Sequence, residues 1–417
     1  MRIRTESFLF TLFLSALGGM TPLSVDMGLP ALASIGKSLH VSAAEAGLTL
    51  SFFLAGFALG PIVLGPISDR FGRRPVLLGG TTLFAIAGTG CALAHALPWL
   101  LFWRLLAGIG AGASSTLSLA IVRDLFDGIT ARVRLSYVTT VGTLAPMIAP
   151  TIGALILAHG GWRTIYGTLA VIGFILLGVI LFYFEETLPK IHPHALEPRR
   201  LAANYGRFLR HPLCFGYALT ASLNFGGIFS YVSSSPLVMM GVLGVSPTFY
   251  GWTFASTALG IMTGAFINGK LSARGVPGPT LIAGGLIASA VASLAILGLA
   301  HTPLVSVATI LPLLVLNTFC LGFVSPNTNQ GAMHPMPDIA GVAAAIVGSG
   351  RMIVASVASV IISVIFDGRT AHAMGLTMSL FAIAALAVYF LFVRPAERNA
   401  ALVLVVTGND PEPGLPP

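Results

Sequence analysis

Three charged side chains lie inside long apolar runs of the sequence, where charge is costly. Asp26 lies in LSVDMGLPAL, Arg104 opens RLLAGIGAGAS, and Arg351 lies about 12 residues into the run 339–364. A carboxylate in such a run can take up and release a proton, whereas a guanidinium can pair with it or bind an anionic or carbonyl-rich molecule. The pattern therefore indicates proton exchange beside a site for a small molecule.

Each of these residues also has a structural interpretation. The first apolar run could end near Val25, so that Asp26 meets water. Arg104 could snorkel to an interface. Arg351 could reach polar backbone at a helix break, since two glycines lie close to it in the sequence. If the runs end near residues 32 and 98, Asp26 and Arg104 each lie six residues in, at one depth of about 9 Å.

The composition places these charges in a membrane protein. Hydrophobic residues make up 55% of the 417 residues and charged residues 9%, with a mean hydropathy of +0.91. A soluble protein would carry about a quarter charged residues. The net charge of +8 does not indicate nucleic acid, because the basic residues fall in loops on one side of the predicted spans.

The sequence predicts an all-α membrane protein with twelve spanning helices. Of 22 Lys and Arg residues, 17 fall in segments on one predicted side and three in loops on the other, which indicates cytoplasmic termini. The expected spans are 8–32, 46–66, 75–95, 98–121, 135–158, 163–184, 212–235, 248–270, 278–299, 304–330, 339–364 and 372–393.

The chain repeats itself, which predicts two six-helix halves around a central cavity. A shift of 204 residues aligns 39–74 with 243–278 and superposes several glycines and a loop arginine. The expected parts are an N-terminal half (1–184), a cytoplasmic linker (185–211), a C-terminal half (212–393) and a disordered tail (394–417). The matched pairs include Gly47/Gly251, Gly56/Gly260, Gly60/Gly264, Gly65/Gly269 and Arg70/Arg274.

The turn between the second and third spans carries a dense cationic motif, LGPISDRFGRRP. Its glycines let two helix ends approach. The stretch GPISDRFGRRP resembles the signature loop of the major facilitator superfamily. This resemblance implies a cytoplasmic gate in which Asp69 meets the start of the eleventh span near Gly341. The loop residues assigned to the gate are Gly65, Asp69, Arg70, Gly72 and Arg73.

Further segments resemble the drug-exporting bicyclomycin-resistance (Bcr/CflA) branch of that superfamily. The run around Asp26 is similar to the branch's Thr-Asp-Met-Tyr-Leu-Pro-Ala, with Val25 and Gly28 at the Thr and Tyr positions. RDLFDGITARVRLSY also resembles the branch. It adds Arg123 and Asp124, which either belong to the gate or are simply solvated at the inner end of the fourth span.

Two helix motifs resemble known functional segments of the superfamily. The Arg104 motif is similar to the helix-4 signature, whose arginine is linked to proton movement, so Asp26 and Arg104 form the predicted proton-coupling pair. LAPMIAPTIGAL resembles the helix-5 motif typical of antiporters and favours export over uptake. Its expected functional residues are Pro146, Pro150 and Gly153.

Several polar residues inside spans are candidates for the substrate cavity, although hydrogen bonds between helices are the alternative for each. The nine histidines show no metal-ligand spacing, and no phosphate-binding glycine loop is present. The sequence therefore predicts no metal, no cofactor and no enzymatic activity. The cavity candidates are Arg351, Asn224, Tyr231, Asn317 and Tyr137.

Together these features favour a proton-coupled multidrug efflux transporter that works by alternating access. The expected partners are a small-molecule substrate, protons and the lipid bilayer, with no nucleic acid. We expect a monomer in the inner membrane of the cell. The alternatives are a proton symporter or facilitator for a small nutrient or metabolite and, from another class, a non-transporting membrane receptor.

Overall fold

The computed structural model describes residues 7–188 and 195–399, and this part of the chain is helical with no strand. The helices are α1 (Phe8–Asp26), α2 (Leu32–Leu39), α3 (Ala43–Leu59), α4 (Gly65–Phe71), α5 (Arg73–Ala92), α6 (Leu97–Leu125), α7 (Gly128–Tyr183), α8 (Pro198–Arg210), α9 (Pro212–Pro236), α10 (Pro247–Ala273), α11 (Gly278–Leu299), α12 (Val307–Met333), α13 (Ala340–Ile365) and α14 (His372–Val388). Short segments of other helix types join or extend them. The 3-10 segments are η1 (Leu29–Ala31) and η4 (Pro337–Ile339), and the π-helical segments are η2 (Gly60–Leu64), η3 (Leu237–Val242) and η5 (Tyr389–Val393).

The helices account for the twelve predicted spans. Ten segments of the described chain are long and apolar enough to cross a membrane. One of them, α7, has 56 residues and turns at Gly161, where φ is +76°, so it holds two of the expected spans. Helix α10 matches the expected span 248–270 but is not among the ten, because its glycines, threonines and serines make it less apolar.

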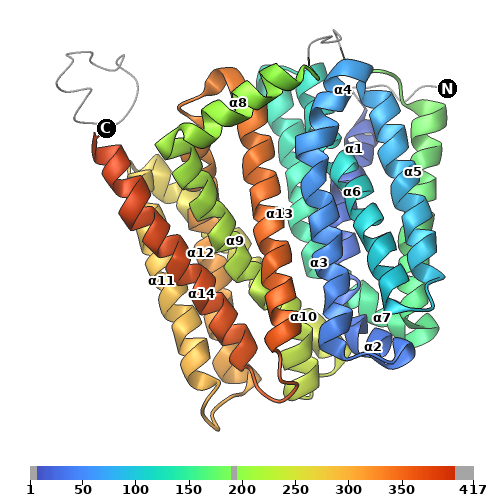
Figure 1. The fold of residues 1–417 in the computed structure, drawn as a ribbon, viewed down its shortest axis with the longest axis vertical. Coiled ribbons are helices and arrows are strands. Elements are labelled where there is room, and N and C mark those ends of the chain that lie inside the picture. Colours follow the sequence, from blue (N-terminus) through green and yellow to red (C-terminus); the bar gives the residue numbers. More distant parts are fainter. Residues whose placement is uncertain (1–6, 189–194, 400–417) are drawn as a thin grey trace.

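Both ends of the described chain lie at the same end of the bundle, which also carries α8 (Figure 1). We call this the α8 end, and the opposite one the α2 end. Arg134 near the start of α7 donates to the carbonyl of Ser7, with the two atoms 3.1 Å apart. Tyr217 near the start of α9 hydrogen-bonds to Glu397. The starts of α1, α7 and α9 and the end of the last helix thus lie together, as an even number of spans requires.

The glycines matched by the internal repeat have the same role in both halves. A Cβ atom at Gly56 would lie 2.1 Å from the carbonyl oxygen of Leu105 in α6. At Gly260, its match in the second half, a Cβ would lie 2.9 Å from the carbonyl oxygen of Val315 in α12, and at Gly264 it would lie 2.1 Å from that of Phe319. In each half, the second spanning helix (α3 or α10) therefore touches the fourth (α6 or α12) through their backbones. This equivalence supports two halves, although the boundaries 1–184 and 212–393 stay a prediction.

The expected linker, 185–211, contains a helix that contacts both halves. Tyr205 of α8 donates to the carbonyl of Ile62 at 3.3 Å, and Arg207 pairs with Asp338 at 2.5 Å. The predicted disorder is wrong for residues 394–399, which continue as helix. The remainder of that expected tail, 400–417, lies outside the described residues.

The two halves meet along α3 and α13. The hydroxyl of Ser356 donates to the carbonyl of Ser51 at 2.8 Å, and the hydroxyl of Ser349 donates to the carbonyl of Ala58 at 2.6 Å. Figure 1 shows these two helices side by side. Ser51 lies halfway along α3 and Ala58 near its end, so these bonds join the halves near the middle of the bundle.

Candidate functional site

The first helix breaks at the residue predicted to carry the proton. Helix α1 ends at Asp26, and the chain continues through Met27 and Gly28 into the short turn η1 before α2 begins. Pro30 lies in this turn and lacks a backbone N–H, so a regular helix cannot continue through it. The side chain of Asp26 is only 4% exposed. The interpretation in which Asp26 meets water is therefore wrong.

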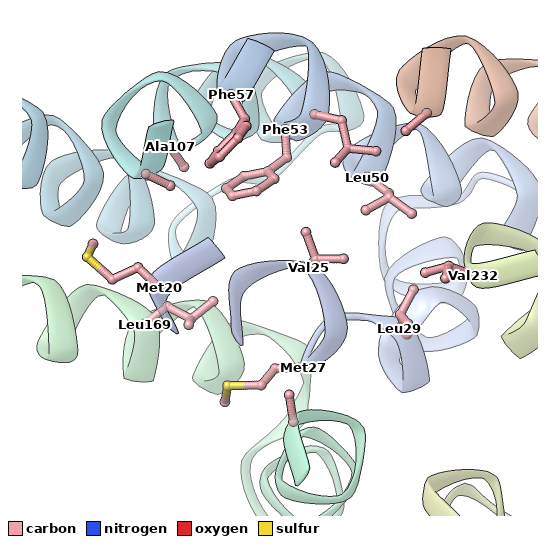
Figure 2. Close-up of a cluster of buried hydrophobic side chains, with 14 of the residues drawn as sticks. Met20, Val25, Met27, Leu29, Leu50, Phe53, Phe57, Ala107, Leu169 and Val232 are labelled. Carbon is pink, nitrogen blue, oxygen red and sulfur yellow. The ribbon is translucent and has the colours of Figure 1, made fainter. Parts of the chain in front are cut away.

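Apolar side chains flank the break. Figure 2 shows Val25, Met27 and Leu29 around it, with Phe53 of α3 above and Val232 of α9 across from Leu29. Because α9 belongs to the second repeat, the break lies where the two halves meet. The break thus has the place expected of a transporter site, at the interface between repeats.

The Asp26 carboxylate has no hydrogen bond and no ion pair within the described chain. It lies within electrostatic range of two tyrosine hydroxyls from the other half, those of Tyr231 and Tyr250. The Tyr231 hydroxyl shares a hydrogen bond of 2.9 Å with Thr257, and the Tyr250 hydroxyl shares one of 2.9 Å with Ser235. Tyr231 was predicted from sequence. Tyr250 was missed, and only the fold brings it near Asp26.

Arg104 binds the broken end of α1 rather than the carboxylate. Its guanidinium donates to the hydroxyl of Ser24 at 2.9 Å, to the carbonyl of Ser24 at 3.2 Å and to the carbonyl of Thr49 at 3.1 Å. The Ser24 carbonyl belongs to the last turn of α1, where carbonyls lack helical partners and carry partial negative charge. Arg104 is 3% exposed, so it does not snorkel, and in the described chain it makes no ion pair with Asp26.

The helix-5 motif packs directly onto the break. Pro146 and Pro150 lie inside α7, and a Cβ atom at Gly153 would lie 2.2 Å from the carbonyl oxygen of Met27. Only a residue without a side chain allows this approach of the two backbones. Gly153 therefore sets the position of the residue that follows Asp26 in the chain.

Arg351 lies inside the second half without an acidic partner in the described chain. One of its terminal nitrogens donates to the hydroxyl of Ser325 in α12 at 3.1 Å. The guanidinium also lies over the ring of Phe225 in α9, 5.8 Å from its centroid. Its Nε is buried and makes no hydrogen bond. A planar cation with an unused donor is suited to a carbonyl or carboxylate of a bound molecule.

The other cavity candidates do not gather around Asp26. Asn317 donates to the hydroxyls of Ser289 and Ser293, at 3.1 and 2.9 Å, and so ties α12 to α11. Asn224 is buried in α9. Tyr137 is 54% exposed and lies near the α8 end, in a groove with Phe8 of α1. Asp26 lies 18 residues along α1 from Phe8, or about 27 Å away.

A second polar cluster lies at the α8 end, in the predicted gate. Arg73 is 7% exposed, and its guanidinium pairs with Asp69 at 2.5 Å and with Asp124 at 2.7 Å. Asp69 thus bonds within its own half. It makes no contact with Gly341, which has open space at its Cβ position. The expected contact with the eleventh span is absent from this part of the structure. Gly65 has open space beside it, and Arg70 and Arg123 are exposed.

Sequence reasoning missed Glu186 in this cluster. Its carboxylate accepts from the backbone N–H groups of Arg73 and Arg74, at 2.8 and 3.1 Å, and so caps the start of α5. Gly72 has φ of +101°, and a Cβ atom there would lie 2.3 Å from Glu186 Oε2. The predicted requirement for glycine at this turn has a physical cause in both the backbone angle and the lack of space.

Comparisons with known proteins agree with this architecture. The sequence profile described as "Major Facilitator Superfamily" matches residues 8–359. The chain belongs to the major facilitator superfamily. It is a multi-pass membrane protein of a transporter family, as the resemblance implied.

Similar proteins cover nearly the whole chain. It is 33% identical to the "Uncharacterized MFS-type transporter YdgK" of Bacillus subtilis, over 91% of this chain and 94% of that protein. It is 30% identical to the "Bicyclomycin resistance protein homolog" of Haemophilus influenzae, over 94% and 98% of the two chains. A solved bacterial homolog of the lysosomal transporter Spinster superposes with a TM-score of 0.72 at 17% identity, covering 95% and 97% of the two chains, which shows the fold alone.

Replacing Gly153 tests the contact between α7 and the break. Gly153→Ala places a methyl group against the Met27 carbonyl, and overpacking of this kind costs about 1–3 kcal/mol. The variant should melt at a lower temperature in detergent and transport more slowly. Gly142→Ala is the matched control, because Gly142 lies in the same helix with nothing within 4 Å of its Cβ position. Equal melting temperatures for the two variants would contradict the contact.

Arg104→Lys tests whether Arg104 closes the end of α1. Lysine keeps the charge but has a single nitrogen, so it cannot reproduce the three bonds that three guanidinium nitrogens make to Ser24 and Thr49. The loss of charged hydrogen bonds should lower stability by about 2 kcal/mol. Thermal unfolding in detergent measures it. If Arg104→Lys melts like the wild type, the hydrogen bonds of Arg104 to Ser24 and Thr49 have no role in stability.

Proposed function

We propose that this protein exports small amphipathic drugs in exchange for protons, and that Asp26 is the proton-carrying group. The observation that carries the proposal is a buried carboxylate without a counter-ion, at the interface between two repeats. An ionised carboxylate is expensive to bury alone, and the charge can be removed by a proton or balanced by a bound cation. One carboxylate cannot favour both at once, so proton and substrate binding become mutually exclusive.

The names of two relatives support drug export. One is the Haemophilus protein named for bicyclomycin resistance, and the other is the "Multidrug resistance protein MdtL" of Escherichia coli, 31% identical over 59% of this chain. The helix-5 motif adds a structural argument, because Gly153 fixes the backbone beside Asp26. A motif typical of antiporters thus lies in contact with the proposed proton site.

The predicted charge asymmetry supports an orientation with the α8 end in the cytoplasm of a cell with an inner membrane. In this orientation, the contacts of η1 with α9 and of α2 with η3 would close the side opposite the cytoplasm, and the serine bonds between α3 and α13 would extend this closure to the middle of the bundle. Asp26 and its tyrosines would then exchange with the cytoplasm. Rocking of the halves would expose them to the outside. We further propose that one chain is sufficient for transport.

The cluster around Arg73 is the proposed gate at the cytoplasmic end. It links the loop after α4 to the end of α6 through Asp69 and Asp124. When the halves close on this side, Asp69 would exchange part of its bond with Arg73 for the N-terminal N–H groups of α13, which favour negative charge. This contact would stabilise the outward-facing state of the transporter, in which the cytoplasmic side is closed.

Arg351 is the proposed contact for uncharged polar groups of the substrate. Its Nε has no partner, and its other bonds go to an uncharged hydroxyl and an aromatic face. If one cavity reaches both this cation and the Asp26 carboxylate, the charge in that cavity is balanced. Such a cavity should prefer neutral polar compounds to permanent dications.

Asp26→Asn tests the coupling. The amide is nearly the same size and stays neutral, so the protein should fold but lose transport driven by a pH gradient at least tenfold. Exchange of substrate across the membrane without a gradient should continue. Transport of a fluorescent dye in everted vesicles, with and without a pH gradient, measures both.

Asp127→Asn is the control, because Asp127 is an exposed acid at the start of α7. Full proton-driven efflux by Asp26→Asn would end the proposal. Uptake into right-side-out vesicles driven by the same gradient would favour a symporter instead.

Arg351→Ala tests the selectivity of the cavity. Removing the guanidinium should shift the ratio of cation to neutral-compound transport upward several-fold, while expression stays nearly unchanged. The comparison is with Arg369→Ala, which removes an exposed arginine from a loop. A variant that loses thermal stability without any change in this ratio would show that Arg351 is only a structural tie.

A further inference from the structure

Two histidines that are far apart in the sequence meet at the α2 end of the second half. His301 follows the end of α11, and His372 begins α14. His372 Nδ1 lies 3.1 Å from His301 Nε2, and the ring planes are inclined by 63° with centroids 4.8 Å apart. Neither residue takes part in the proposed transport site.

The separation of the two nitrogens is that of two ligands on one metal ion. Imidazole nitrogens bind zinc at about 2.0–2.1 Å, so a separation of 3.1 Å corresponds to an N–metal–N angle of about 100°. This value lies between the square-planar and tetrahedral angles used by late transition metals. The two facing nitrogens are therefore close enough to bind one ion together.

Hydrogen bonds fix the backbone of both histidines. The backbone N–H of His301 donates to the carbonyl of Gly298 at 3.4 Å, and that of His372 donates to the hydroxyl of Thr370 at 3.3 Å. Thr370 in turn donates to Asp367 at 2.7 Å. The N–H of Arg369 and the hydroxyl of Thr370 lower the pKa of Asp367 to about 2, so this carboxylate stays ionised at neutral pH.

The pair is also open to water. His301 is exposed, His372 is half-buried, and the other ring nitrogens make no hydrogen bond in the described chain. An ion held by two imidazoles could therefore complete its coordination with water molecules.

We propose that His301 and His372 form a binding site for one late transition-metal ion of the Zn²⁺, Cu²⁺ or Ni²⁺ class. In the metal-free pair, one ring donates its N–H to the other. On binding, that hydrogen moves to the far nitrogen of the same ring by exchange with water. Both facing lone pairs then bind the ion. Hard cations such as Mg²⁺ prefer oxygen ligands and are excluded.

The ion would fasten the α11–α12 turn to the start of α14. Both attachments belong to the second half, so the ion should stabilise that half without locking the rocking motion between halves. Its effect should therefore appear in thermal stability and not in transport rate.

The experiment uses the full chain purified in detergent with a tag that contains no histidine. The protein is stripped with a chelator and titrated with Zn²⁺, with Mg²⁺ as the comparison ion. We expect about one Zn²⁺ per chain and a rise of several degrees in melting temperature. His301→Ala and His372→Ala should each weaken zinc binding at least tenfold and abolish the rise. His95→Ala is the control, because His95 is an exposed histidine at the same end that makes no contact with another histidine in the described chain.

His301→Gln separates a metal site from a simple hydrogen bond. Glutamine can still bond to His372 but is a poor zinc ligand, so this variant should keep its zinc-free melting temperature and lose the response to zinc. The proposal is overturned if the wild type binds no more zinc than the double alanine variant, or if zinc still stabilises His301→Gln. Since no transport is measured, the result does not depend on the proposed function.

Discussion

The guanidinium of Arg104 makes it possible to bury a broken helix end inside a membrane protein. The last turn of any helix leaves carbonyl groups without partners, and in an apolar bundle water is not at hand to satisfy them. Arg104 reaches from α6 to Ser24 in that turn and to Thr49 in α3 with one rigid group. Its charge also opposes the negative end of the α1 dipole. The same contact holds three helices together around Asp26.

This arrangement explains why Asp26 and Arg104 lie at one depth of the bundle without forming an ion pair. If Arg104 bonded Asp26 directly, the carboxylate would be permanently neutralised and could not exchange a proton readily. By binding Ser24, Arg104 leaves the acid two residues further on available. The two tyrosines within electrostatic range of Asp26 come from the other half, so their distance from it changes when the halves move. The proposed proton site thus depends on the relative position of the two halves, as alternating access requires.

Sequence periodicity and composition were sufficient for the fold. Long apolar runs, the one-sided arginines and the matched glycines predicted twelve helices in two related halves, because these features respond to the bilayer and to helix packing alone. The site was predicted in part. Asp26 and Arg104 were found because charges stand out in apolar runs, and Gly153 was found because its segment resembles the helix-5 motif. Their partners were not, since Tyr250, Glu186 and Ser24 are ordinary residues until the fold brings them near. The pairing of His301 with His372, 71 residues apart, has no local spacing that a sequence pattern could show.

The glycine contacts and the serine bonds described above divide the molecule into stiff and compliant parts. Within each half, glycines such as Gly56 and Gly264 let helices touch through their backbones, and displacing them would produce immediate steric overlap. Between the halves along α3 and α13, the bonds in the described chain are single hydroxyl–carbonyl bonds, each contributing about 1 kcal/mol. Thermal energy can break such bonds one by one, but it cannot compress touching backbones. We therefore expect the easiest deformation of this bundle to be a movement of the two nearly rigid halves relative to each other. Along α3 and α13, the serine–carbonyl hydrogen bonds oppose this movement.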